Sequence, residues 1–96
     1  MNDLITEEKL NKYFSITKEA LDMINKKGID ETRKKEALDF LDMASRYYYD
    51  AEHFESKGDY VNAFAALNYA HGWLDAGARI GLFKVKDSRL FTVDDD

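Results

Sequence analysis

Residues 45–83 read SRYYYDAEHFESKGDYVNAFAALNYAHGWLDAGARIGLF and decide the fold. The second half of this stretch, residues 59–83, contains neither lysine nor glutamate. It is too apolar for an ordinary surface helix. Its charged residues also argue against a membrane span, because each charge near a bilayer centre costs at least ~2.5–3.5 kcal/mol. We therefore expect a helix over residues 60–81 that is buried on most of its circumference.

A helix stop and a helix start stand side by side in Lys57-Gly58-Asp59. A basic residue suits the last turn of a helix, a glycine suits the left-handed position after it, and an aspartate suits the N-cap of the next helix. Two helices joined this tightly run antiparallel. The sequence predicts an αα-hairpin of helices over residues 31–57 and 60–81, with a positive φ at Gly58.

The N-terminal part predicts a further amphipathic helix over residues 7–27. Thr6 is a suitable N-cap, apolar residues then recur at spacings of three and four, and Gly28 suits the C-terminal cap. We expect one all-α domain over residues 1–96, a three-helix bundle with a short extended tail at 84–96. The apolar tail residues, which we expect to cover part of the third helix, are Leu90, Phe91 and Val93.

Composition excludes several classes of protein. The 96 residues carry a net charge of −5 and no cysteine, which rules out disulfides, thiolate catalysis and iron–sulfur clusters. An acidic domain repels phosphate backbones, so we expect no nucleic-acid partner. The opening segment MNDLITEEKL has no apolar run, so we expect no signal peptide, no membrane partner and a cytoplasmic location.

One polar stripe interrupts the apolar third helix, because polar residues follow one another there at steps of three and four. These residues are Asn68, His71, Asp75 and Arg79, with Gly72 among them. One interpretation is a small ligand pocket in which His71 exchanges a proton and Arg79 holds an anion. The other is a structural seam of satisfied polar groups against the first helix or a second subunit.

A metal site is a weaker hypothesis. Asp50 and His53 have the i, i+3 spacing of the Glu-x-x-His element in di-iron bundles, and His71 with Asp75 offers a second histidine–carboxylate pair. Dedicated di-metal bundles use four helices and more carboxylates, so the sequence predicts no cofactor. It also contains no nucleophile elbow, phosphate loop or dinucleotide motif, and we assign no catalytic residue.

Three consecutive tyrosines, residues 47–49, lie at steps of about 100° around the second helix. They cannot all face one core, so at least one meets solvent, a ligand or another chain. We include Tyr48 and Tyr49 among the candidate contact residues.

The C-terminal half to two-thirds of the chain resembles an archaeal family known as domain of unknown function 357. The resemblance rests on Tyr48-x-Asp50-Ala51-x-His53-Phe54, Lys57-Gly58-Asp59, Tyr69-Ala70-His71-Gly72-Trp73-Leu74-Asp75-Ala76-Gly77, Gly81-Leu82-Phe83 and Leu90-Phe91-Thr92-Val93. It implies a small helical bundle of archaeal origin and no assigned activity.

Two functional hypotheses remain. The first is a non-enzymatic interaction or scaffold module that contacts protein through the third helix and the tyrosines. A two-fold homodimer would fit it, with Gly77 and Gly81 allowing close backbone approach across the interface. The alternative is a small-ligand or metal-binding helical domain centred on His71, Asp75 and Arg79.

Overall fold

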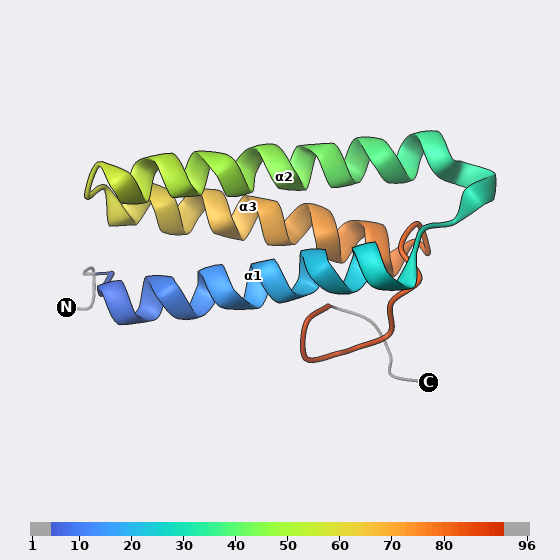
Figure 1. Ribbon diagram of the computed structural model, residues 1–96, viewed down its shortest axis with the longest axis horizontal. Coiled ribbons are helices and arrows are strands. Elements are labelled where there is room, and N and C mark those ends of the chain that lie inside the picture. The colour runs from blue at the N-terminus through green and yellow to red at the C-terminus, as the bar shows by residue number, and fades with distance from the viewer. Residues whose placement is uncertain (1–4, 92–96) are drawn as a thin grey trace.

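The computed structural model describes residues 5–91 and is an all-α bundle (Figure 1). Its elements are α1 (Glu7–Lys27), a 3₁₀ turn (Glu31–Arg33), α2 (Lys34–Ser56) and α3 (Tyr60–Arg79). Within the described residues there is no strand, and an isolated antiparallel bridge joins Ile29 to Phe83. The predicted three-helix bundle with a short tail is confirmed.

Local capping explains where the helices begin and turn. The Thr6 hydroxyl accepts a hydrogen bond from the Lys9 N–H at 3.1 Å, and the Asp59 carboxylate accepts one from the Asn62 N–H at 3.2 Å. Gly58 between α2 and α3 has φ +74°, as predicted from its place after a helix.

Two predicted boundaries shift by a few residues. The second helix begins with the 3₁₀ turn, where the Asp30 carboxylate accepts from the Thr32 N–H at 3.0 Å, and it ends at Ser56. The third helix ends at Arg79 and not at residue 81, because Gly81 turns into the left-handed region with φ +79°.

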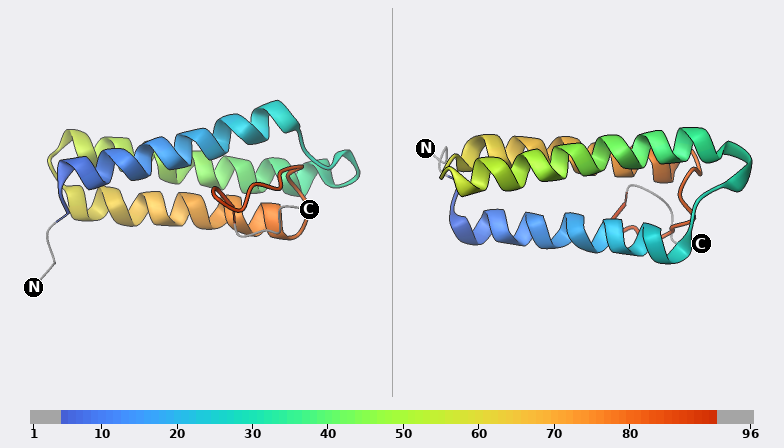
Figure 2. Two further views of the ribbon diagram at one scale, coloured as in Figure 1. Left: turned by 90° about the horizontal axis from the view of Figure 1, so that it is seen from below. Right: turned by 45° about the horizontal axis from the view of Figure 1, so that its top comes forward.

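The helices form an open arrangement in which α3 contacts both of the others. α2 and α3 make the antiparallel hairpin, and α1 packs along α3 (Figures 1 and 2). No Cα atom of α1 lies within 8 Å of a Cα atom of α2. These two helices meet through large side chains instead, such as Phe14 and Tyr48, whose rings lie edge to face at 5.6 Å.

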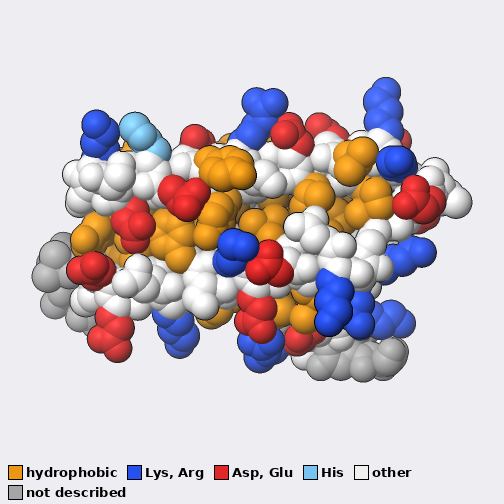
Figure 3. Space-filling view, viewed as in Figure 1, with side chains coloured by type: hydrophobic (Ala, Val, Ile, Leu, Met, Phe, Trp, Pro, Cys, Tyr) orange, Lys and Arg blue, Asp and Glu red, His pale blue; other side chains and the backbone are white. Residues whose placement is uncertain are grey.

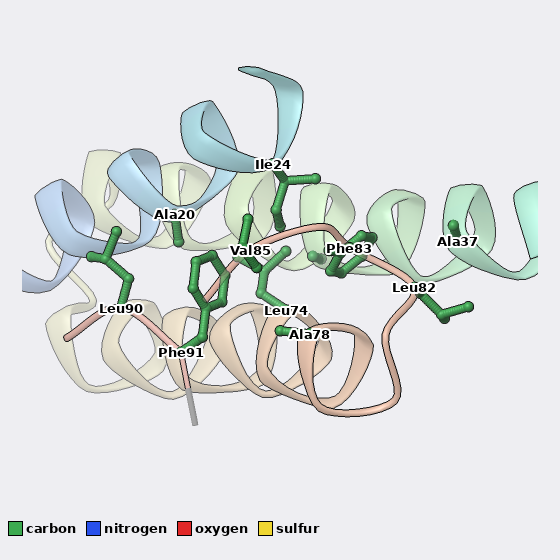
Figure 4. Close-up of a cluster of buried hydrophobic side chains, with 11 residues drawn as sticks. Ala20, Ile24, Ala37, Leu74, Ala78, Leu82, Phe83, Val85, Leu90 and Phe91 are labelled. Carbon is green, nitrogen blue, oxygen red and sulfur yellow. The ribbon is translucent and has the colours of Figure 1, made fainter. Parts of the chain in front are cut away.

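The chain after α3 completes the core. It returns along α1 and α3 and buries five apolar side chains in a cluster with residues of all three helices (Figure 4). These are Leu82, Phe83, Val85, Leu90 and Phe91. The expectation that Leu90 and Phe91 cover the third helix is therefore met, whereas Val93 lies outside the described residues. A second cluster near the hairpin turn joins α1 to α2 and α3.

The prediction that Gly77 allows close backbone approach across an interface is wrong, whereas the prediction for the exposed Gly81 stays a prediction. The Phe83 ring of the same chain lies directly against Gly77, so no second backbone reaches this position. Gly81 lies in the turn after α3, where its positive φ is a conformation that favours glycine.

Candidate functional site

His71 joins three parts of the chain. Its Nε2 atom lies 2.5 Å from the Leu90 carbonyl oxygen, and its Nδ1 atom lies 3.2 Å from the Thr17 hydroxyl. A carbonyl oxygen only accepts, so Nε2 carries a proton and donates it. In the neutral ring Nδ1 then accepts from the Thr17 hydroxyl. His71 thereby fastens both α1 and the tail to α3.

Asp75 lies beside this ring. Its carboxylate is 3.8 Å from His71 Nε2, and the two side chains are 31% and 21% exposed. Together with Asn68 they line a hollow of about 240 Å³ between α1 and α3. Of the predicted polar stripe, Asn68, His71, Gly72 and Asp75 line this hollow, whereas Arg79 is not among its lining residues.

The structure does not gather the predicted metal ligands. Asp50 and His53 are exposed on α2, whereas His71 and Asp75 lie in the seam. Among residues 5–91, no three histidine, aspartate or glutamate side chains lie close enough together to hold a metal ion. The i, i+3 spacing of Asp50 and His53 places them on the solvated face of α2, which explains the separation.

The three tyrosines point in different directions, as their spacing requires. Tyr47 stacks on Tyr69 of α3 with ring centroids 5.3 Å apart. Tyr48 turns towards α1 and meets Phe14. Tyr49 is 68% exposed. Tyr47, which is not among the predicted contact residues, therefore links α2 to the outer surface of α3.

Tyr48 and Tyr49 line a groove of about 320 Å³ between α1 and α2. Figure 3 shows hydrophobic side chains along this seam, with charged side chains on both sides. Burial raises the pKa of the Tyr48 hydroxyl, and the negative charge of Glu52 raises it further. The groove is mixed in character, because Leu21 and Leu41 line it together with the charged side chains of Lys18, Asp22 and Glu52.

One face of α3 is apolar and exposed, while its other faces are buried or half-buried against the rest of the bundle. The residues at successive steps of three and four along this face, which we call the α3 stripe, are Val61, Ala65, Tyr69, Gly72, Ala76 and Ile80. Val61 is 60% exposed, Tyr69 64% and Ile80 52%. Periodicity reveals this line of residues, but it does not reveal that neither α1 nor α2 covers it.

The contacts of His71 were missed at the level of sequence. Thr17 falls on the buried face of α1, where a hydroxyl among apolar residues signals a polar partner. The Leu90 carbonyl gives no such signal, because every residue has a backbone carbonyl group.

Comparison with protein families assigns the chain to a family, and the matched residues cover the helical bundle. The family model described as "Protein of unknown function (DUF357)" matches residues 12–83, which include most of α1 and all of α2 and α3. The chain belongs to this family. No curated protein and no solved structure shows significant similarity to this DUF357 member. In the described part of the DUF357 chain, no helix has the length and apolar character needed to cross a membrane.

Proposed function

We propose that this protein is a non-enzymatic interaction module that binds protein through the α3 stripe, and that its partner is a second copy of the chain. The observation that carries the proposal is the exposure of a charge-free apolar line along the whole of α3. Val61 at its beginning, Tyr69 near its middle and Ile80 at its end are each more than half exposed. Contiguous apolar surface of this kind usually marks a protein contact.

The order of side-chain sizes along the α3 stripe suits two-fold pairing. Its ends carry Val61 and Ile80, and its middle contains Gly72, beside which a side chain would meet nothing within 4 Å. In an antiparallel pair of α3 helices crossing near Gly72, Val61 of one copy faces Ile80 of the other. Gly72 leaves room at the crossing for the exposed Tyr69 ring of the other copy, and closed two-fold dimers are the commonest assembly of small soluble chains.

The Tyr47–Tyr69 stack adds a rigid aromatic edge to this surface. Its rings are inclined by 21° to each other, and Tyr69 itself belongs to the α3 stripe. Tyrosine favours interfaces because it offers a large apolar body and a hydroxyl tip. This arrangement supports a role for the tyrosine cluster in the same contact.

The alternative, a ligand site centred on His71, Asp75 and Arg79, has weaker support. Both ring nitrogens of His71 already have protein partners, and Arg79 does not share the hollow that His71 and Asp75 line. A ligand would have to displace the Thr17 or Leu90 contact to reach the ring.

Sedimentation equilibrium of the full chain at tens of micromolar tests the proposal. We expect twice the 11.1 kDa chain mass. Ala65→Glu should return the monomer, because a dimer would bury an unpaired charge, while the exposed position and the helix propensity of glutamate preserve the fold. Asn11→Glu, the same charge change on the exposed side of α1, should leave the dimer intact. A monomeric wild-type chain, or equal loss in both variants, would contradict the proposal.

A further inference from the structure

A basic hollow lies at the end of the bundle where α1 and α3 both terminate. It measures about 820 Å³, and its lining includes the side chains of Lys27, Arg79, Lys84 and Lys86 around Met23 and Phe83. These four cations come from α1, the last residue of α3 and the tail. Figure 3 shows lysine and arginine side chains gathered at the lower right, at the end of the bundle where α1 terminates and the tail begins.

The packing of the tail places two of these cations on one side of the chain. Phe83 and Val85 are buried at 2% and 5% exposure. Because alternate residues of an extended chain point to opposite sides, Lys84 and Lys86 both project outwards on the same side. The Lys84 N–H donates to the Gly28 carbonyl at 3.0 Å, which holds the tail against the end of α1.

Within the described part of the chain, one carboxylate, that of Asp87, lines the hollow. This carboxylate accepts from the Arg89 N–H at 2.9 Å and lies 3.6 Å from the Arg89 guanidinium. Among residues 5–91, the ammonium groups of Lys27, Lys84 and Lys86 form no ion pair and no hydrogen bond. Four cations are therefore concentrated at one place on a chain of net charge −5.

Helix dipoles account for only part of this cluster. Lys27 and Arg79 lie in the last turns of α1 and α3, where positive charge is favourable. Lys84 and Lys86 belong to no helix, yet they line the same hollow. Four like charges at one place repel one another, and an anion bound among them would relieve this repulsion.

We propose that this hollow binds a small phosphorylated molecule, with its phosphate groups held by Lys27, Lys84 and Lys86. Its volume lies within the range of about 300–1,000 Å³ that is usual for small-molecule sites. Ammonium groups bind phosphate through charge-assisted hydrogen bonds, and the half-buried side chain of Met23 offers apolar contact to the rest of such a molecule. None of these residues belongs to the α3 stripe, so this site and the proposed dimer are independent.

Inorganic pyrophosphate is the probe, titrated into the full chain at constant ionic strength while backbone amide shifts are followed by NMR. We expect saturable shifts that concentrate around residues 27, 79 and 84–86. The double variant Lys84→Gln/Lys86→Gln should weaken binding by about tenfold or more, since hydrogen bonds to charged groups are lost. Both lysines are exposed, so the melting temperature should stay close to that of the wild type.

The matched control is Lys12→Gln/Lys57→Gln, which removes the same charge from exposed positions outside the hollow. It should leave the affinity within about twofold, because screened charges at a distance contribute little. Shifts that do not saturate, or equal weakening in the two double variants, would overturn the proposal. The protein can also be sedimented with vesicles that contain a phosphoinositide. If it binds these vesicles but not pyrophosphate, the small-molecule site is overturned and the hollow binds a lipid headgroup instead.

Discussion

The ring of Phe83 occupies the space beside Gly77 that a side chain would need. A Cβ atom at Gly77 would lie within 2.8 Å of three atoms of this ring. Phe83 is only 2% exposed, so the ring has little room to move. Because Gly77 has no side chain, the Phe83 ring fits beside α3 and the tail can pack against the bundle.

This relationship predicts opposite effects for two glycines of the same helix. Gly77→Ala should lower the free energy of unfolding by about 2 kcal/mol, because overpacking outweighs the gain in helix propensity. Gly72→Ala should raise it by about 0.8–1 kcal/mol, since a Cβ there meets nothing within 4 Å. Urea denaturation at low protein concentration, where self-association does not contribute, measures both. Equal stabilisation by the two alanines would show that the Phe83 ring yields freely.

The helices and the hairpin turn could be predicted from the sequence because their signals are local. Thr6, Gly28 and Asp59 act on backbone groups within a few residues of themselves. The 3₁₀ turn shifts the start of α2 by only a few residues, within the precision that capping residues allow.

The basic hollow and the His71 seam could not be predicted in the same way. Lys27 and Lys84 are far apart in sequence, and the fold brings them together through the Lys84–Gly28 hydrogen bond. The residues near Lys27 in sequence are interleaved with acids and indicate only a solvated turn. His71 donates to a backbone carbonyl, and the sequence does not indicate such a partner because every residue type has this group. Periodicity likewise identifies the α3 stripe but not the absence of a covering helix.

Removing the His71 ring should loosen both of the segments that it fastens. His71→Ala should lower the free energy of unfolding by about 1–2 kcal/mol, because two hydrogen bonds are lost and the buried Thr17 hydroxyl loses a partner. Hydrogen exchange at the Phe91 amide, which donates to the Asp87 carbonyl at 2.9 Å, should quicken as the tail detaches.

His53→Ala is the matched control for this prediction. His53 is exposed on α2, so its removal should change stability by less than about 0.5 kcal/mol. A double-mutant cycle of His71→Ala with Thr17→Val should show a coupling energy of about 0.5 kcal/mol or more. Additive effects would mean that the ring and the hydroxyl contribute separately.

The turn between α2 and α3 depends on the left-handed conformation of Gly58. Its φ of +74° strains any residue with a Cβ, although the space beside it is open. Gly58→Ala should therefore lower the free energy of unfolding by about 1 kcal/mol, entirely through the backbone. Gly58→Asn should cost less, because asparagine tolerates the left-handed region better. An unchanged denaturation midpoint for the alanine variant would contradict the assignment.

Asp30 should make stability depend on pH in the acid range. Hydrogen bonds from the Thr32 hydroxyl and the Arg33 guanidinium, with a further one from the Thr32 backbone, lower the pKa of Asp30 to about 2. The ordinary value is about 3.9, so the folded state favours the ionised carboxylate. The stabilisation is thus fully present above about pH 4 and is lost as the pH falls towards 2.

Two measurements check this dependence. The difference in urea midpoint between the wild type and Asp30→Asn should shrink as the pH is lowered from about 5 to about 2, since the protonated aspartate then resembles asparagine in charge. The carboxyl carbon shift of Asp30, followed by NMR, should titrate below the range of an exposed aspartate. Thr32→Val removes the largest of the three causes and should move the pKa upwards. A pKa near the ordinary value in the wild type would mean that these hydrogen bonds do not persist in solution.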